Sequence, residues 1–249
     1  MKFCVTGGGT VAPIDDVRRI ANFSTGRFAA EISEALLRRG GEVWHLRTPS
    51  ALAPFGRDAC LDLDAEDLAA EFARLTDLRE RYRSVRASFH PRTLVEGTVK
   101  EYASTLRDIL TTFPIDVVFH AAALSDYEPE ATQGKLISGA GSMNLRCVPV
   151  PKVIRSVKDW APSTYLVGFK LLSDVSRERL IEVARASNEA NRADLTVAND
   201  FRTVREGRQT LHLVRPGREV ETLTPGPDLA ERLVDRVCLW VTKEGVEPQ

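Results

Sequence analysis

Short runs of apolar residues alternate with longer amphipathic segments along most of this chain. The apolar, β-branched-rich runs lie at 3–5, 43–46, 117–120, 165–169 and 195–198. Segments with helical spacing of apolar positions lie near 28–38, 97–112, 151–158, 176–190 and 227–242. Strands that alternate with helices in this way predict a parallel sheet that is covered by helices on both faces.

Two regions interrupt this alternation. Residues 48–92 combine a proline-containing turn, an acidic helix candidate from Asp64 to Leu75 and an arginine-rich piece. Residues 128–150 contain three glycines without a clear period, and 143–150 could form a strand before the chain returns at Pro151. A short hairpin is expected around Pro216-Gly217. We therefore expect one domain over residues 1–249: an α/β, Rossmann-like parallel sheet with helices on both faces and a protruding arm at about 128–150.

Composition and charge narrow the class of protein. The chain is 43% hydrophobic and has a formal net charge of -1, so nothing indicates a nucleic-acid or membrane partner. The arginines between 79 and 92 are interrupted by acids, which favours a solvated helix face over a substrate rim. Four distant cysteines without C-x-x-C spacing indicate free thiols, not disulfides or zinc ligands. With no signal sequence or membrane-spanning apolar run, we expect a cytoplasmic protein.

The most informative segment is a double loop after the first apolar run. Gly7, Gly8 and Gly9 precede Thr10, and their bare backbone can approach an anion and point N–H groups at it. Ser24-Thr25-Gly26 follows, at the expected start of a helix, where small polar residues make a second phosphate site. Two anion cradles on one unit predict a substrate set that carries several phosphates.

A dinucleotide-binding turn is an alternative interpretation of the same glycines. Gly7, Gly9 and Ala12 satisfy the G-x-G-x-x-[GA] pattern, but Pro13 and a turn at 14–16 delay the helix until about Ser24. Arg47 stands where a ribose-binding acid is expected, although an arginine there suits a 2′-phosphate. An NADPH-dependent reductase of Rossmann type therefore remains open, as does a glycine turn that only reverses the chain.

Polar and small residues follow several of the predicted strands. His120 leads into Ala121, Ala122 and Ala123, which leave room for a flat group, and then Asp126 offers a carboxylate. Further strands end at Gly168-Phe169 and at Asn199-Asp200, and Lys135 lies on the loop after Asp126. The alanines could simply pack against a helix, and Asn199-Asp200 could be a capped turn. Because ligands of open parallel sheets bind at the carboxyl ends of strands, we expect one composite site at this edge.

Several segments together resemble those of a known enzyme family, phosphopantothenate–cysteine ligase, in its stand-alone bacterial form. They occur in the family's order: Gly8-Gly9-Thr10, Pro13-Ile14-Asp15, Val17-Arg18, Asn22, Ser24-Thr25-Gly26, 123–129, 135–138, 151–154, 168–172 and 198–200. Leu172, Ile137 and the absence of a Gly-Phe-rich loop after Asp200 depart from the fused two-domain form.

The resemblance implies a two-step reaction. The carboxylate of 4′-phosphopantothenate attacks the α-phosphate of CTP to give an acyl-cytidylate and pyrophosphate, and the amine of cysteine then releases CMP. It also implies Mg²⁺, and a homodimer in which the arm at 128–150 completes the partner's site. A non-catalytic nucleotide-binding regulator is a third hypothesis.

The resemblance also implies roles for individual residues. Asn22 and Lys135 would be catalytic, Asn22 and Arg18 would bind the pantothenate substrate, and no residue is expected to be a metal ligand. The implied nucleotide-binding residues are Gly8, Gly9, Thr10, Ser24, Thr25, Gly26, His120, Ala121, Ala122, Asp126, Lys135, Gly168 and Phe169.

Overall fold

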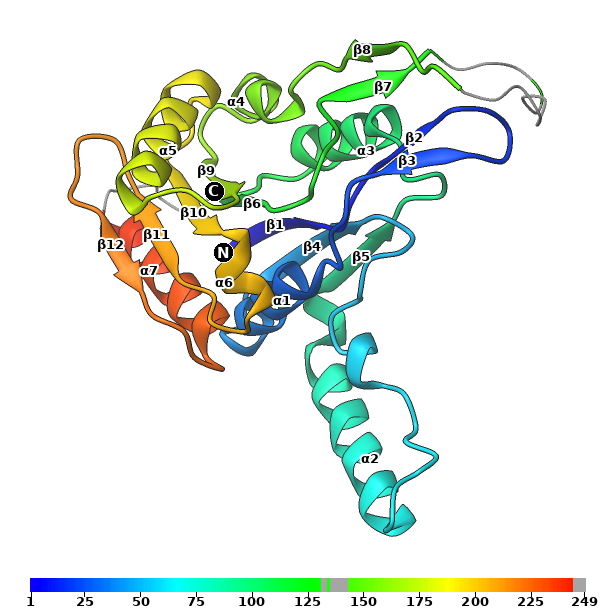
Figure 1. Ribbon diagram of the computed structural model, residues 1–249. Coiled ribbons are helices and arrows are strands. Elements are labelled where there is room, and N and C mark those ends of the chain that lie inside the picture. Colours follow the sequence, from blue (N-terminus) through cyan, green and yellow to red (C-terminus); the bar gives the residue numbers. More distant parts are fainter. Residues whose placement is uncertain (131–133, 135–142, 244–249) are drawn as a thin grey trace.

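A computed structural model describes residues 1–130, 134 and 143–243 and shows a mostly parallel sheet (Figure 1). The sheet has the order β12-β11-β10-β9-β6-β1-β4-β5, and the strands from β10 to β5 are parallel. The predicted α/β class is therefore confirmed. The strands are β1 (Lys2–Gly7), β4 (Glu42–Arg47), β5 (Phe89–Thr93), β6 (Val117–His120), β9 (Tyr165–Leu172), β10 (Leu195–Asp200), β11 (Leu211–Val214) and β12 (Glu221–Leu223).

Helices cover both faces of the sheet. One face carries α1 (Arg27–Arg38) and α7 (Leu229–Lys243), and the other carries α3 (Val99–Thr112), α4 (Val157–Trp160) and α5 (Arg177–Asn191). In α1 the residues Ala29, Ile32 and Leu36 recur at helical spacing and are buried against β1 and β4. Successive residues of β1 point to opposite faces, so Val5 joins the core under α1 and Cys4 joins the core under α3.

The double loop after β1 contains a hairpin that the sequence did not predict. β2 (Val11–Pro13) pairs with β3 (Arg19–Ala21), and the turn between them is held by Asp15, whose Oδ1 accepts the N–H groups of Val17 at 2.9 Å and Arg18 at 2.7 Å. The sequence predicted the turn at 14–16 but not the strands beside it, because strands of three residues are too short to show an alternation of apolar and polar positions. Helix α1 begins at Arg27 rather than at about Ser24.

Residues 48–92 form a projection at the edge of the sheet (Figure 1). It comprises η1 (Gly56–Asp58), α2 (Leu68–Val85) and η2 (Arg86–Ser88) before β5. The predicted helix exists, but its bounds of 64–75 were wrong, because Asp67 caps the start and the arginine-rich segment continues the helix. Arg79, Arg81 and Arg83 are exposed on α2, as expected for a solvated face. β5 was missed because it is a polar edge strand containing Pro91.

The predicted arm at 128–150 begins and ends in a small antiparallel sheet. β7 (Tyr127–Pro129) pairs with β8 (Cys147–Pro149), and this sheet runs beside β2 and β3 away from the main sheet (Figure 1). At Gly134 the carbonyl oxygen accepts the N–H of Asp16 at 3.4 Å. Residues 131–133 and 135–142, including Lys135, lie outside the described residues.

Three smaller findings complete the fold. The chain returns from the arm through η3 (Val153–Ser156), and a short helix, α6 (Phe201–Arg205), follows β10. The four cysteines are free thiols, of which Cys4 is buried, and burial raises its pKa to about 12. Within the described part of the chain, no helix combines the length and apolarity needed to cross a membrane.

Candidate functional site

Two adjoining cavities lie at the carboxyl edge of the central strands. Cavity A, of about 550 Å³, lies between the start of α1 and the segment around α6, and cavity B, of about 500 Å³, lies beside η3 and α5. Both are lined by Ala122, Ala123, Phe169 and Leu171. The shared wall makes them two halves of one site, at the edge where the sequence predicts it.

Many of the predicted site residues meet here. Those that line cavity A are Ser24, Thr25, Gly26, Ala121, Ala122 and Phe169. Those that line cavity B are Asn22, His120, Ala122, Asp126 and Phe169.

The start of α1 gives cavity A a positive end. Gly26 is the N-cap residue at φ 71° and has no side chain to cap the helix, the Arg27 N–H donates to Thr25 Oγ1 at 3.4 Å, and the first turn contains no acid. N–H groups of the first turn lack an intrahelical partner and carry the positive end of the helix dipole. With Ser24 and Thr25 beside them, these groups can bind phosphate oxygens.

The three glycine-loop residues Gly8, Gly9 and Thr10 are buried and line neither cavity. The Ala123 amide donates to the Gly8 carbonyl at 2.8 Å, and the Thr10 amide donates to the Ala123 carbonyl at 3.1 Å. A Cβ on Gly9 would lie 1.9 Å from the carbonyl oxygen of Asn22. These residues therefore hold the loops at 22–26 and 121–125 together, and their predicted phosphate contact stays a prediction.

Asn22 is fixed at the boundary of the two loops. Its amide Nδ2 donates to the carbonyl of Ala123 at 3.3 Å, and its backbone N–H donates to the carbonyl of Thr10 at 3.1 Å. The side-chain oxygen and the second N–H of the amide have no partner among the described residues and can serve a ligand in cavity B. This neutral group can orient a carboxylate, as the family resemblance implies.

Cavity B also holds two lysines to which the sequence analysis gave no role. Lys152 forms an ion pair with Asp126, so its charge is balanced. The side chain of Lys170, near the end of β9, makes no hydrogen bond or ion pair with another described residue. Both lysines belong to segments that carry the family resemblance, at 151–154 and 168–172. That membership was the sequence signal that could have identified them as site residues.

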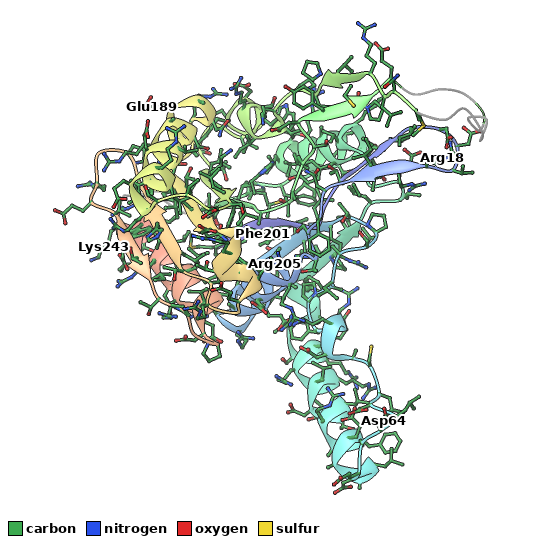
Figure 2. All side chains as sticks on the ribbon, in the orientation of Figure 1. Arg18, Asp64, Glu189, Phe201, Arg205 and Lys243 are labelled. Atoms are coloured by element: carbon green, nitrogen blue, oxygen red, sulfur yellow. The ribbon has the colours of Figure 1, made fainter. Side chains whose placement is uncertain are left out.

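Cavity A gains residues from the segment after β10. Asp200 caps α6 by accepting the N–H of Arg202 at 2.8 Å, as a capped turn would. This cap turns Phe201, Val204 and Arg205 toward cavity A, and Asn199 lines it too. Phe201 and Arg205 are labelled near the centre of Figure 2. The sequence analysis left the residues after Asp200 unassigned.

Two further predicted residues line neither cavity. Arg18 is on the β2–β3 turn, paired with Asp15 at 3.2 Å, and Figure 2 shows it far from Phe201 and Arg205. Gly168 is not a lining residue of either cavity, but an added Cβ there would lie 3.2 Å from Ile154, which lines cavity B. The predicted roles of Arg18 in substrate binding and of Gly168 in nucleotide binding stay predictions.

His120 is a buried, neutral residue at the floor of cavity B. Its Nε2 has no hydrogen-bond partner among the described residues, and its ring packs edge-on against Tyr102 at 5.7 Å between centroids. Burial lowers the pKa of His120 from 6.5 to about 4, because the charged imidazolium is poorly solvated there. His120 therefore carries no charge near neutral pH.

The buried histidine makes stability depend on pH. The unfolded chain takes up a proton on His120 near pH 6.5, whereas the folded chain does so only near pH 4, so acid favours unfolding between these values. His45, whose pKa burial lowers to about 3, acts in the same direction. We expect the urea midpoint to fall between about pH 7 and pH 5, and His120→Gln to reduce that fall. An unchanged pH dependence in the variant would contradict this assignment.

No metal site is built from side chains in the described part of the chain, where no three His, Cys, Asp or Glu residues cluster. The one carboxylate of the predicted site in cavity B, Asp126, is already paired with Lys152.

Comparison with known proteins decides the family. A model of the DNA/pantothenate metabolism flavoprotein C-terminal domain matches residues 1–75 and 89–239. The human phosphopantothenate–cysteine ligase is 30% identical over 271 residues, which cover 94% of this chain and 84% of that protein. The chain belongs to the phosphopantothenate–cysteine ligase family. The resemblance found in the sequence is thereby confirmed.

Other relatives agree with this membership. The Coenzyme A biosynthesis bifunctional protein CoaBC of Thermococcus kodakarensis is 30% identical over 95% of this chain, and the chain spans 50% of that protein's length. The solved DNA/pantothenate metabolism flavoprotein of Streptococcus pneumoniae has a TM-score of 0.75 at 27% identity and covers 96% of this chain, with 99% of that structure matched. A Cab2 mutant in complex with phosphopantothenate-cysteine shares the fold, with a TM-score of 0.83 at 22% identity, over 97% of this chain and 86% of that one.

Proposed function

We propose that this chain is a ligase of coenzyme A biosynthesis that joins 4′-phosphopantothenate to L-cysteine at the expense of CTP. The observation that carries this proposal is the pair of cavities A and B, which share the wall formed by Ala122, Ala123, Phe169 and Leu171. One cavity offers an anion-binding helix start and the other an orienting amide beside lysines. The membership of the family supplies the substrates.

In the first half-reaction the nucleotide occupies cavity A. The nucleoside lies against Ala121, Ala122 and Phe169, whose ring is held edge-on by Phe28 at 6.3 Å between centroids. The phosphates reach the N–H groups at the start of α1. The carboxylate of the pantothenate substrate, oriented by Asn22, then attacks the α-phosphate in line with the leaving pyrophosphate.

In the second half-reaction the amine of cysteine attacks the acyl carbon and CMP leaves. No side chain acts as a covalent nucleophile, because positioning and charge neutralisation suffice for such a transfer. Asn22 touches the carboxylate before activation and the acyl group after it, so it serves both steps.

Magnesium would be bound mainly by the nucleotide, whose phosphate oxygens are the hard ligands that this ion prefers. The described side chains form no cluster for a metal ion, so the ion would arrive with CTP and supply charge neutralisation when bound.

We place the reaction in the cytoplasm and propose a homodimer in which Lys135 acts on the partner's site. The ends of the arm, β7 and β8, run away from the chain's own sheet (Figure 1). The carbonyl of Gly134 accepts a hydrogen bond from the N–H of Asp16, on the turn of the β2–β3 hairpin. An arm with this direction suits the site of a second copy better than its own. Sedimentation should find a dimer, and a fully active monomer would contradict this proposal.

The test of function is pyrophosphate release from the purified protein with 4′-phosphopantothenate, with CTP or ATP, and with or without cysteine. We expect CTP to support turnover much better than ATP, because the backbone-lined slot at 121–123 can match a pyrimidine edge. Equal turnover would remove the base selectivity and leave the ligase activity in place. Nucleotide binding without pyrophosphate release would instead indicate a regulator.

The alternative of an NADPH-dependent reductase has little support in the geometry. Arg47, the residue that could bind a 2′-phosphate, lines neither cavity A nor cavity B. Titration with NADPH, followed by cofactor fluorescence, should show no binding.

Changing Asn22 to aspartate should separate the half-reactions. Asn22→Asp keeps the shape of the side chain but adds a negative charge beside the bound carboxylate. We expect some acyl-cytidylate to form and to be passed poorly to cysteine, so that the intermediate accumulates relative to CMP. Rapid quench with labelled CTP measures both species, and equal loss of the two steps would contradict a role of Asn22 in the second.

A further inference from the structure

A third cavity lies at the base of α2 and has no lining residue in common with cavities A and B. Its volume is about 640 Å³, and we name it the α2 pocket. Its apolar wall includes Phe55, Leu78, Tyr82 and Phe89. The three aromatic rings pack edge-on against one another, with centroids 5.7 to 6.5 Å apart. Such a wall suits a flat or branched apolar group.

The charge of the α2 pocket has one sign. Two guanidinium groups, of Arg47 and Arg79, line it, and no aspartate or glutamate does. Among the described residues, neither arginine has a carboxylate within 4.0 Å. Arg47 donates one side-chain hydrogen bond, to the carbonyl of Ala51 at 2.6 Å. Two cations without a counter-charge at an apolar cavity favour an anion as its ligand.

Part of the wall of the α2 pocket lies outside the family model. Leu78, Arg79 and Tyr82 fall between the matched segments 1–75 and 89–239, so they lie outside the part that the family model describes. These three residues therefore have no counterpart in the family model.

We propose that the α2 pocket binds a small amphipathic anion, in which an aromatic or branched apolar body carries a carboxylate, sulfonate or phosphate group. The body packs against Phe55, Tyr82 and Phe89, and the anionic group pairs with Arg47 and Arg79.

The loop at 51–57 connects this pocket to the nucleotide side of the site. The Leu52 amide donates to the carbonyl of Thr25 at 2.9 Å, and Ala51 lies so close to Gly26 that a Cβ there would meet it at 2.9 Å. At its other end the loop places Phe55 in the pocket wall. A ligand that packs on Phe55 therefore acts on a loop that touches the start of α1.

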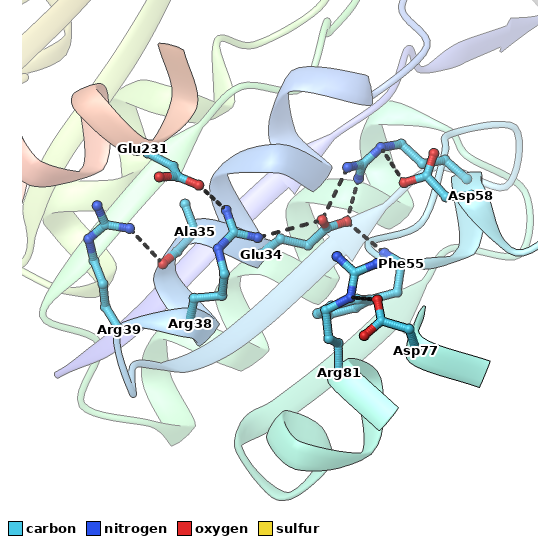
Figure 3. Close-up of polar contacts among 10 residues, drawn as sticks. Glu34, Ala35, Arg38, Arg39, Phe55, Asp58, Asp77, Arg81 and Glu231 are labelled. Atoms are coloured by element: carbon cyan, nitrogen blue, oxygen red, sulfur yellow. Dashed lines mark hydrogen bonds and ion pairs between the residues drawn. The ribbon is translucent and has the colours of Figure 1, made fainter. Parts of the chain in front are cut away.

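Phe55 has an unusual backbone conformation within this loop. Its φ of 61° and ψ of -32° are disfavoured for a side chain of this size, and the Gly56 amide donates back to the carbonyl of Pro54 at 2.7 Å. Glu34 of α1 holds this turn by accepting the Phe55 N–H at 2.7 Å (Figure 3). A strained turn that is tied to α1 can change its geometry when a ligand fills the pocket, and this coupling rests on the proposed nucleotide role of cavity A.

Binding is tested on the whole protein with 1-anilinonaphthalene-8-sulfonate, an aromatic sulfonate whose fluorescence rises in apolar sites. We expect one site per chain, about 10-fold weaker binding in Arg79→Gln, and unchanged binding in the control Arg83→Gln on the exposed face of the same helix. Naphthalene-2-carboxylate should compete and naphthylmethylamine should not. Wild-type affinity in Arg79→Gln, or displacement of the probe by the amine, would overturn the proposal.

Coupling is tested by measuring the CTP affinity by calorimetry with and without saturating probe. We expect a change of about 3-fold or more, and the same factor in the probe's affinity when CTP is saturating. An unchanged CTP affinity would overturn the coupling. Failure of CTP to bind at all would instead count against the proposed function, and the probe titration would still decide whether the α2 pocket is a ligand site.

Discussion

Lys135→Gln is expected to slow acyl-cytidylate formation by about 100- to 1,000-fold, the usual effect of removing one preorganised charge from a transferring phosphate. Lys135 is the only lysine between Lys100 and Lys152 in the sequence. The charge of Lys152 is already balanced by Asp126, so it is less available to a triphosphate. Rapid quench with labelled CTP measures the first step directly, and Lys158→Gln, at a lysine paired with Asp194 at 2.7 Å, is the control.

A mixing experiment then shows in which subunit Lys135 acts. If its arm completes the partner's site, a mixed dimer of Lys135→Gln and Asn22→Asp chains has one site with both residues intact. A random mixture should regain about a quarter of the normal rate, since about half of its dimers are mixed. No recovery in a mixture shown to contain mixed dimers would place Lys135 in its own chain's site. A near-normal first step in Lys135→Gln alone would make the lysine an exposed arm residue.

Glu34→Ala is expected to lower the free energy of unfolding by about 3–5 kcal/mol, the cost of breaking a buried ion pair by removing one partner. The side chains of Glu34 and Arg57 are 9% and 13% exposed and form an ion pair, and Arg57 also donates to Glu34 Oε2 at 3.1 Å. Glu34 further accepts the N–H of Phe55 in the strained turn (Figure 3). The substitution leaves the Phe55 N–H without its acceptor, and the Arg57 guanidinium keeps, among the described residues, only Asp58, an exposed partner at 3.3 Å.

A nearby exposed pair provides the control for this measurement. Glu231 pairs with Arg38 at 2.7 Å, but their side chains are 45% and 47% exposed, so Glu231→Ala should cost about 1 kcal/mol or less. Urea unfolding of both variants at one pH gives the comparison. A similar loss of unfolding free energy in the two variants would show that the contacts of Glu34 stabilise the fold no more than an exposed ion pair does.

The sequence predicted the sheet and its site edge because both depend on local patterns. The apolar run at 117–120 and the polar residues after it predict a buried strand that is followed by a loop. The sequence did not predict that Gly9 packs against the backbone of Asn22, because this close contact arises from the packing of the β2–β3 hairpin. The spacing suggested a phosphate loop, which stays a prediction, and only the structure shows that Gly9 also holds two loops together.

Electrostatic partners were equally hidden in the sequence. Lys152 and Asp126 are far apart along the chain, and only the fold brings them together in cavity B. The bounds of α2 were wrong for another reason: charges on both sides of residue 75 mask the helical period, and the helix keeps only Glu71 and Leu78 buried. A helix with so small a buried face has little periodicity for the sequence to show.

The common wall of cavities A and B has a consequence for the fate of the proposed intermediate. Ala122, Ala123, Phe169 and Leu171 line both cavities and would border both the nucleotide and the pantothenate substrate, so the mixed anhydride would form and be consumed at one place. It would not need to diffuse between two centres or to enter bulk water, where a reactive acyl phosphate is hydrolysed. In the cell this arrangement would keep the consumption of CTP matched to the formation of the amide bond, even when cysteine is scarce.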